Sequence, residues 1–392
     1  MCIYLIQYIC VPLFYKDSKS VLIPGDCFFL DIKLMKRDAP GKRRYTGYLF
    51  ISFQEGHIVG EASEELRLFR LGSKEISVEV LNLGALLHSV TLPDRDGKPV
   101  DVVLGFDQLE DYTGPHPNFG LTVGRVANRI RNATFTLDDT VYTLKANNGA
   151  HHLHGGPKGF GRRLWTPEYV DDTSVTFHLF SRDGDEGYPG NLNATLTYTV
   201  AANALILDYA AAADKPTPVN LTNHAYFNLN GGMRDVLNHQ VKLFASRRVE
   251  ADEALIPTGK LVDVAGTAYD FRTPKTVAKG LDELGNDQGF DLCYVLAPTG
   301  ESLPKIAEVF EPDTGIAMEV FTSEPGVQFY TANFLDGSIK GKNGTAYTRH
   351  FGLCLETQKF PDSPNNPSFP DITLRPGDLM RSRTIYTFSV RK

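Results

Sequence analysis

The feature that most constrains the fold is a series of short runs rich in β-branched and aromatic residues. Apolar and polar residues alternate in these runs, for example in Val175–Phe180, Ala194–Val200 and Leu205–Ala210. Such alternation is typical of strands that bury one face. Turn signals such as Asp183-Gly184-Asp185 separate the runs. The 35 glycines and 23 prolines of the chain suit many tight connections.

Helical periodicity is scarce in this sequence. Few windows keep it over three turns, and we expect one helical turn at Asp282–Gly285. No repeat of fixed period appears, which argues against a propeller. Many short strands with little helix predict an all-β protein built as a large antiparallel β-sandwich.

Composition limits the classes of partner. The 392 residues carry a net charge of -7, and the charges are dispersed along the chain. Nothing therefore indicates a nucleic acid or an anionic membrane as partner. The five cysteines are widely spaced and form no CxxC pair. This usage predicts reduced thiols in a cytoplasmic protein, without a disulfide framework or a zinc site.

The N-terminal part of the chain differs from the rest. Met1–Phe14 is apolar, but it is too short to span a bilayer and lacks the basic flank of a signal peptide. Residues 1–63 show no clear period and carry the basic patch Lys42-Arg43-Arg44. We interpret residues 1–63 as an N-terminal extension of unknown role, partly disordered, and residues 64–392 as one domain.

Two strand-like runs each contain a residue that can transfer a proton. Glu356 lies in the apolar run Phe351–Glu356, and His224 lies in Asn220–Leu229. In the second run, strand alternation puts His224 on a polar face and the leucines on the opposite face. Burying an unpaired carboxylate costs several kcal/mol or raises its pKa. Glu356 is therefore a candidate acid or base, with a structural ion pair as the alternative on this feature alone.

Seven segments together form a family pattern. They are GRVANRI at 124–130, HLHGG at 152–156, GDEGYPG at 184–190, NLTNHAYFNL at 220–229, GFDLCYVL at 289–296, GVQFYTANFLDG at 326–337 and CLETQKFPDSPNNPSFP at 354–370. By these motifs the chain resembles the aldose 1-epimerase (galactose mutarotase) family. The motifs follow one another in the same order as in that family, from about residue 64 to the C-terminus. The resemblance implies a large antiparallel β-supersandwich with a sugar-binding cleft and no metal or cofactor.

The resemblance also implies roles for seven residues. Glu356 corresponds to the catalytic base of the family and His224 to its catalytic acid. The residues that match sugar contacts are Asn128, Arg129, His154, Asp291 and Gln328. None of these matched positions is substituted. The expected activity is interconversion of the α and β anomers of free aldohexoses such as galactose and glucose.

The residue types suit that chemistry. Anomer exchange needs the C1 hydroxyl deprotonated and the ring oxygen protonated, so that the ring opens to an aldehyde. After rotation about the C1–C2 bond the ring closes on the other face of the carbonyl. One base and one acid on opposite sides of the anomeric centre suffice. A glutamate in an apolar strand can have a raised pKa, and a histidine can give and retake a proton.

Three other functions fit part of the sequence. A glycoside hydrolase would use Asp291 and Glu356 as its carboxylate pair. A sugar-binding protein would keep the fold without turnover. A hexose-6-phosphate mutarotase would need further Arg or Lys side chains at the cleft rim, and the motif segments show no such cluster.

Several other residues have structural interpretations. His152 and His154 share one face of an extended HLHGG segment, but two such histidines and a distant acid seldom complete a metal site. We expect Arg125 to be a structural partner of a cleft carboxylate and Cys354 to be a core residue. The only partner we expect is a sugar, bound by a monomer or weak dimer.

Overall fold

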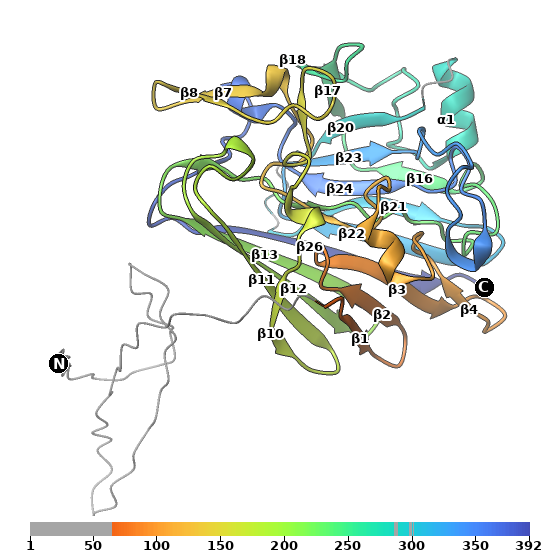
Figure 1. Ribbon diagram of the computed structural model, residues 1–392. Coiled ribbons are helices and arrows are strands. Elements are labelled where there is room, and N and C mark those ends of the chain that lie inside the picture. Colours follow the sequence, from red (N-terminus) through yellow and green to blue (C-terminus); the bar gives the residue numbers. More distant parts are fainter. Residues whose placement is uncertain (1–64, 286–288, 298–299, 301) are drawn as a thin grey trace, which may run out of the picture. The chain divides into compact units, whose positions relative to one another are not determined.

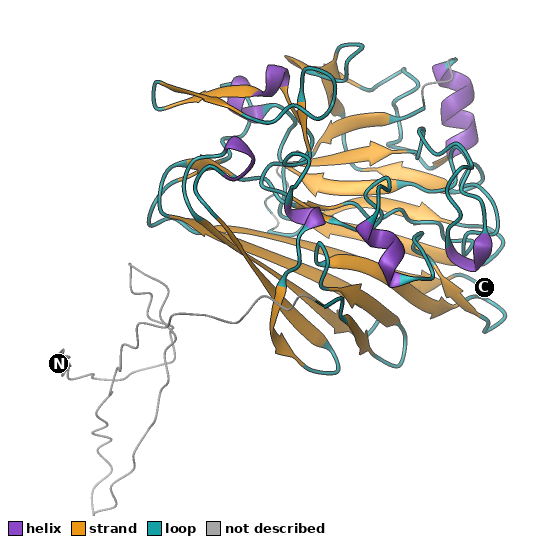
Figure 2. Ribbon diagram, in the orientation of Figure 1, coloured by secondary structure: helices purple, strands orange, loops and turns teal. Residues whose placement is uncertain are grey.

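A computed structural model describes residues 65–285, 289–297, 300 and 302–392. The chain divides into two units, Met1–Glu61 and Ala62–Lys392. The predicted N-terminal extension, residues 1–63, lies outside the described residues, so the division of the chain at residue 63 and the partial disorder stay predictions. The described residues form the sheets drawn in Figures 1 and 2.

A nine-stranded sheet is the largest element of the fold. Its strands lie in the order β10 (Thr166–Val170), β11 (Ser174–Ser181), β12 (Leu192–Ala201), β13 (Ala204–Ala213), β26 (Met380–Val390), β22 (Ile316–Thr322), β21 (Lys305–Phe310), β16 (Gln240–Leu243) and β19 (Lys275–Thr276). The runs Val175–Phe180, Ala194–Val200 and Leu205–Ala210 form β11, β12 and β13, which are neighbours in this sheet. Along β11 and β12 the side chains alternate strictly between buried and partly exposed positions.

Two further sheets pack with it. A five-stranded sheet has the order β18 (Pro257–Asp263), β17 (Arg247–Ala251), β20 (Asp291–Val295), β23 (Gly326–Tyr330) and β24 (Cys354–Gln358). A four-stranded sheet has the order β1 (Leu68–Gly72), β2 (Ser77–Leu81), β3 (Leu86–Pro93) and β4 (Pro99–Asp101). One hydrophobic core contains residues of all three sheets, such as Val80, Leu207 and Leu355.

Four short strand pairs complete the described sheets. They are β5 (Thr122–Val123) with β15 (Thr222–Asn223), β6 (Arg129–Ile130) with β9 (His152–Leu153), β7 (Thr134–Leu137) with β8 (Thr140–Thr143), and β14 (Thr217–Pro218) with β25 (Thr373–Leu374). Every pairing between these named strands is antiparallel. The predicted antiparallel all-β architecture is therefore confirmed.

The described part of the chain contains one α-helix, α1 (Val277–Leu284). Thr276 caps its start, because the Thr276 hydroxyl accepts a hydrogen bond from the Lys279 N–H at 3.2 Å. Gly285 ends it in the left-handed region, with a φ of 67°. The single turn expected at Asp282–Gly285 is thus the end of a longer helix. Eight residues are too few to show three turns of periodicity, which explains the short prediction.

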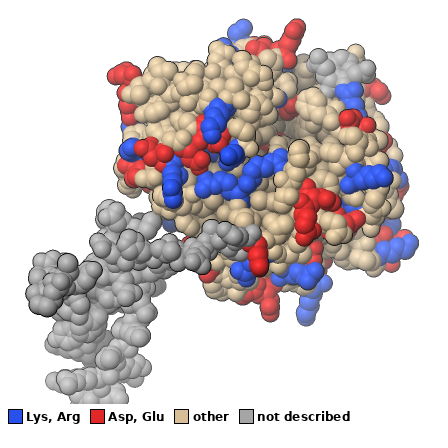
Figure 3. All heavy atoms as spheres, in the orientation of Figure 1, with Lys and Arg blue, Asp and Glu red and all other residues tan. Residues whose placement is uncertain are grey.

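Charged side chains of both signs are mixed on the face drawn in Figure 3. This agrees with the dispersed charges of the sequence. Among the described residues, no helix is long and apolar enough to cross a membrane.

Candidate active site

The candidate site lies on the face of the five-stranded sheet that is turned away from the main core. Successive side chains of a strand point to opposite faces. In β24, Leu355 belongs to the main core, so its neighbour Glu356 points the other way. Gln328 of β23 is the direct register partner of Glu356 and shares that face. β23 and β24 lie side by side in Figure 1.

His224 reaches the same face from a segment beside β24. The segment is held there because Phe227 and Leu353 exchange backbone hydrogen bonds of 2.8 and 2.9 Å. This brings the His224 Nε2 to 3.7 Å from the Glu356 Oε1. Both side chains are buried, and the distance between these two atoms exceeds the length of a good direct hydrogen bond. Both groups can therefore bond to the oxygens of a ligand that lies beside them.

Burial dominates the electrostatics of Glu356. Desolvation raises the pKa of its carboxyl well above the ordinary value of 4.5, nearby Asp291 raises it further, and Arg129 acts in the opposite direction. The Glu356 Oε2 makes no hydrogen bond to a described residue. Such an unsatisfied buried oxygen is costly, and it is available to a ligand hydroxyl.

Aromatic rings enclose His224. It stacks on Tyr226, with ring centroids 5.1 Å apart, and meets the rings of His154 and Tyr330 edge-on at 5.2 and 6.3 Å. Burial lowers the pKa of His224 to about 4. The imidazole of the free enzyme is therefore neutral at pH 7. Its Nδ1 lies 3.6 Å from the Sγ of Cys354.

A turn at Asn128 orients Arg129 and contacts His154 of a second segment. Asn128 adopts a left-handed φ of 62°, and its side-chain oxygen accepts a hydrogen bond from the Arg129 N–H at 2.9 Å. The Arg129 Nε donates to the Asn148 Oδ1 at 3.1 Å. The Asn128 N–H donates to the Nδ1 of His154 at 3.3 Å. The Nε2 of a neutral His154 must then carry the ring proton.

Asp291 and Gln328 form a polar pair beside Glu356. Asp291 begins β20, and its Oδ1 accepts a hydrogen bond from the Gln328 Nε2 at 2.7 Å. Burial raises the pKa of Asp291, while Arg129 and the hydrogen bond from Gln328 oppose that shift. The Oε1 of Gln328 makes no hydrogen bond to a described residue. One acceptor of this pair is therefore free for a ligand.

All seven residues named from the sequence are linked in this one place. Asn128 contacts His154, His154 contacts His224, and His224 faces Glu356. Gln328 joins Asp291 to Glu356, and the charge of Arg129 acts on both carboxyls. Six separate stretches of chain supply them.

Two expectations about neighbouring residues were wrong. An extended HLHGG segment would put His152 beside His154, but His154 has a left-handed φ of 52°. His152 instead bonds to the Lys145 backbone oxygen at 2.7 Å and to the Tyr188 hydroxyl at 2.8 Å, in the protein interior. Within the part of the chain that the structure describes, Arg125 binds no cleft carboxylate. Its guanidinium donates to backbone oxygens and hydroxyls, which are the oxygens of Pro189, Gly190, Ser181, Arg182 and Thr217.

Sequence reasoning missed three residues around the site. Asn148 holds Arg129, and Tyr330 lies against His224. Neither residue has a signal in a single sequence beyond its place near a motif. Cys354 is fully buried, as expected of a core residue, but it also contacts the catalytic candidate His224. Strand alternation could have shown that contact face, since Cys354 and Glu356 are two residues apart.

The site also brings together three potential donor atoms. One from each of His154, His224 and Glu356 lie within 4.8 Å of one another. The same spacing suits three groups that surround a sugar hydroxyl. The prediction that no metal is needed therefore stays open to a chelation test.

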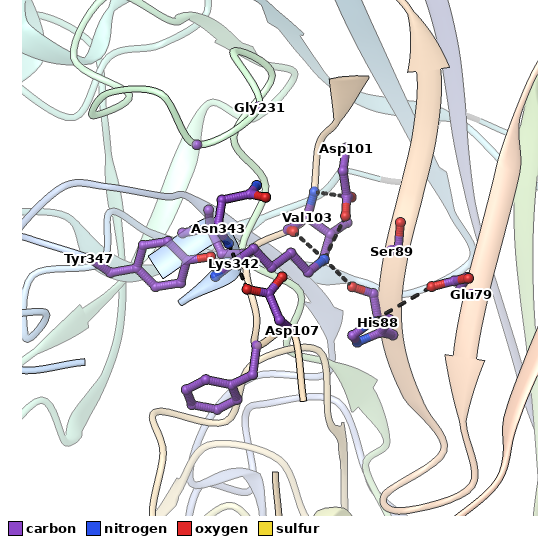
Figure 4. A pocket seen from close by; sticks show the side chains of 13 residues that line it. Glu79, His88, Ser89, Asp101, Val103, Asp107, Gly231, Lys342, Asn343 and Tyr347 are labelled. Atoms are coloured by element: carbon purple, nitrogen blue, oxygen red, sulfur yellow. Dashed lines mark hydrogen bonds and ion pairs between the residues drawn. The ribbon is translucent and has the colours of Figure 1, made fainter. Parts of the chain in front are cut away.

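A separate cavity of about 290 Å³ is lined by none of the seven residues (Figure 4). Lys342 extends along it and donates to the Asp101 carboxylate at 2.6 Å and to the backbone oxygens of His88 and Val103 at 2.6 and 2.9 Å. These three acceptors satisfy the ammonium group. Lys342 therefore ties β3 and β4 to the loop that carries it.

Known proteins share this fold and these motifs. Residues 67–387 match the family described as Aldose 1-epimerase. Galactose mutarotase from Bos taurus is 46% identical over 323 residues, which cover 82% of this chain and 94% of that protein. Aldose 1-epimerase from Escherichia coli (strain K12) is 39% identical over 317 residues, covering 79% and 91%. The crystal structure of a GalM/aldose epimerase homologue from C. elegans has a TM-score of 0.80 and 36% identity, covering 84% of this chain and 100% of that one.

The fold is therefore that of the galactose mutarotase-like proteins, and the class is that of sugar isomerases. The chain belongs to the aldose 1-epimerase family. As such it is an isomerase that interconverts the anomers of aldoses. The fold, the family and the reaction predicted from the sequence are confirmed.

Proposed function

We propose that this enzyme acts on free aldohexoses such as galactose and glucose, with Glu356 as the base and His224 as the acid. One observation carries the assignment of roles. The His224 Nε2 and the Glu356 Oε1 lie 3.7 Å apart in a buried site, and the Glu356 Oε2 is without a partner among the described residues. Two proton-transfer groups at this spacing can reach the two oxygens that the anomeric carbon carries.

Ring opening uses both groups at once. The Glu356 carboxylate takes the proton of the C1 hydroxyl, and the electron pair of that O–H bond forms the C1 carbonyl. The bond between C1 and the ring oxygen breaks, and the ring oxygen takes a proton from His224. Rotation about the C1–C2 bond then turns the other face of the aldehyde toward the ring oxygen. Closure reverses each proton transfer and gives the other anomer.

Protonation of the pair is set by what fills the site. Without a sugar, burial favours the neutral forms of Glu356 and His224. The reaction needs a carboxylate and an imidazolium, which differ from the neutral pair by the position of one proton. Hydrogen bonds from sugar hydroxyls, together with the charge of Arg129, favour the carboxylate. We place the shift of the proton from Glu356 to His224 at sugar binding.

The remaining candidates fix the sugar. Arg129 and His154 offer hydrogen-bond donors, whereas Gln328 and Asp291 offer acceptors. An unpaired acceptor on Gln328 and a carboxylate on Asp291 suit the hydroxyl groups of an aldose. Asn128 supports the neighbouring Arg129 and lies close enough to His154 to share a ligand with it.

Anomeric proton NMR tests the reaction and its substrate class. We expect the enzyme to accelerate exchange between the anomers of free galactose and free glucose. Methyl α-galactoside has its C1 oxygen blocked, so it should stay unchanged. Galactose 6-phosphate in a parallel sample would test the phosphosugar alternative. Release of galactose from the glycoside would move the assignment to a hydrolase with Asp291 and Glu356 as its pair.

A further inference from the structure

Asparagine followed by glycine is the dipeptide at which a protein chain most readily modifies itself. The glycine has no side chain to shield its backbone nitrogen, so this nitrogen can attack the side-chain amide of the preceding asparagine. The sequence contains three such dipeptides, Asn148-Gly149, Asn230-Gly231 and Asn343-Gly344. Whether each of them reacts in the folded protein depends on the hydrogen bonds that hold the two groups.

In two of the three dipeptides the glycine nitrogen is held. The Gly231 N–H donates to the Asn228 backbone oxygen at 3.0 Å, and the Gly344 N–H donates to the Gly341 oxygen at 3.1 Å. Asn230 is also buried, and its amide nitrogen donates to two backbone oxygens. A nitrogen that attacks must first give up such a bond, which slows the reaction by about 2–10-fold per bond.

The third dipeptide lies in a turn at residues 148–151. Asn148 and His151 exchange backbone hydrogen bonds of 3.1 and 3.0 Å, and Gly149 between them is exposed. Among the described residues, none accepts a hydrogen bond from the Gly149 N–H or from the Asn148 Nδ2. Both the attacking nitrogen and the leaving nitrogen are therefore open to water.

A buried cationic side chain holds the amide oxygen of Asn148. The Arg129 Nε donates to the Asn148 Oδ1 at 3.1 Å, and Arg129 itself is only 8% exposed. A guanidinium that donates to an amide oxygen stabilises the negative charge that this oxygen gains when the carbon is attacked. Arg129, a candidate sugar contact, is therefore placed to promote a reaction of the residue that holds it.

We propose that Asn148 is a deamidation site, at which the amide that holds Arg129 becomes a carboxylate as the protein ages. The Gly149 nitrogen gives its proton to solvent, and its electron pair forms a bond to the Asn148 Cγ. The bond from Cγ to Nδ2 breaks, and Nδ2 takes a proton from water and leaves as ammonia. Water then adds to one carbonyl of the succinimide ring and breaks its bond to nitrogen. The product is an aspartyl or an isoaspartyl residue, with one water consumed and one ammonia released.

The aspartyl product carries a negative charge beside Arg129. Arg129 opposes the rise in the pKa of Glu356 and of Asp291, and a carboxylate next to the guanidinium cancels part of this effect. The same carboxylate competes with sugar hydroxyls for the donors of Arg129. Deamidation should therefore lower both sugar affinity and the reactivity of the base. This consequence rests on the proposed roles of Arg129 and Glu356, whereas the modification itself does not.

Peptide mass spectrometry of ageing protein tests the modification. The folded parent is incubated at mildly alkaline pH and digested, and an isoaspartyl methyltransferase labels the isoaspartyl product. We expect Asn148 to react about 3–10-fold faster than Asn343, and Asn230 to react most slowly. In urea-unfolded protein the three dipeptides should react at similar rates, which controls for local sequence. An Asn148 that reacts no faster than Asn343 in the folded protein would overturn the proposal.

Arg129→Ala tests whether the guanidinium promotes the reaction. Without the donor to Oδ1, deamidation of Asn148 should slow by about 3–10-fold. The rate at Asn343 in the same sample is the internal control, because Asn343 lies in the wall of the separate cavity. Faster reaction of Asn148 in this variant would show that Arg129 protects the amide, and it would overturn the proposal.

Three further variants connect the modification to activity. Asn148→Asp reproduces the aspartyl product, and Asn343→Asp is the matched control with the same change of charge. Gly149→Ala keeps the Asn148 side chain but hinders the attack. A β-carbon on Gly149 would meet nothing within 4 Å. Its φ of 60° costs alanine some stability, which urea unfolding measures.

Steady-state anomer exchange gives the second readout. We expect kcat/KM of Asn148→Asp to lie about 3–30-fold below the parent value and that of Asn343→Asp to be unchanged. Aged parent enzyme should lose activity in step with conversion at Asn148, and aged Gly149→Ala should keep it. A normal kcat/KM in Asn148→Asp beside a lowered one in Arg129→Ala would overturn the proposed effect on the site. Normal values in both would instead refute the role of Arg129, and the peptide map would still report on deamidation separately.

Discussion

Replacing Glu356 by glutamine should slow catalysis. It should also raise the free energy of unfolding of the variant relative to that of the parent as the pH rises. The substitution keeps the shape of the side chain and removes its ability to ionise. Loss of one proton-transfer group should lower kcat by about 10²–10⁴-fold, with a much smaller effect on KM. The same buried carboxyl that serves as the base opposes folding whenever it has to be charged.

The sign of the stability effect follows from the direction of the pKa shift. The folded state raises the pKa of Glu356 above its ordinary value of 4.5. Between these two pKa values the folded protein keeps a proton that the unfolded chain has lost. Parent stability therefore falls as pH rises through this window. The glutamine variant has no such proton, so its free energy of unfolding minus that of the parent should grow with pH.

The slope of this difference can reach about 1.4 kcal/mol per pH unit for a single group. From about pH 5 to about pH 7 we expect the variant to gain roughly 1–3 kcal/mol on the parent. A pH-independent cost of about 1–3 kcal/mol reduces the stability of the variant at every pH, because a glutamine amide in this position also lacks partners. The pH dependence is therefore the informative quantity.

Urea unfolding at several pH values gives the free energies, provided that the m-value is the same for both proteins. Glu324→Gln is the matched control. Glu324 is also buried, but both of its oxygens lie 3.2 Å from the Lys359 Nζ. Glutamine there breaks an ion pair, so it should destabilise the protein and leave the anomer-exchange rate unchanged. A pH-independent difference for Glu356→Gln would refute the raised pKa, and near-normal kcat would refute the assignment of the base.

Three further predictions concern the same site. Because the pKa of His224 is lowered to about 4, the acid limb of log(kcat/KM) should fall near that value; a limb near the ordinary 6.5 would show that the empty site does not desolvate the ring. Arg129→Ala and Asp291→Ala should raise KM more than they lower kcat in anomer-exchange assays, and the reverse pattern would place them in the chemical step. Dialysis against EDTA should leave activity intact; a loss that a divalent ion restores would contradict a cofactor-free mechanism.

Much of the fold could be predicted because strand alternation is a local property. The runs at Val175–Phe180 and Ala194–Val200 needed only period two and flanking turns, and they form β11 and β12. The order of strands in the nine-stranded sheet could not be read in this way. β13 pairs with β26, although more than 160 residues separate them in sequence. Such pairing depends on the packing of the whole core.

The residues of the site likewise differ in whether local sequence was enough to predict them. Glu356 could be recognised because a carboxyl group in an apolar strand is locally anomalous. His154 and Arg129 could be named only through the family motifs, since both depend on left-handed residues that break strand periodicity. For this reason the expected sharing of one face by His152 and His154 was wrong. The contact of Cys354 with His224 required the pairing of two distant segments.

The position of the site explains why this sheet tolerates unsatisfied polar atoms. On one face of β24, Leu355 packs into the main core, and this burial stabilises the sandwich. On the opposite face, the Glu356 Oε2 and the Gln328 Oε1 lack partners among the described residues, and each costs about 1–3 kcal/mol in the empty protein. A sugar hydroxyl that bonds to these oxygens removes this cost, and the relief contributes to the free energy of sugar binding. An apolar substitution at Gln328 should therefore weaken sugar binding, while any gain in stability from removing the unpaired Oε1 is offset by the hydrogen bond that the buried Asp291 loses.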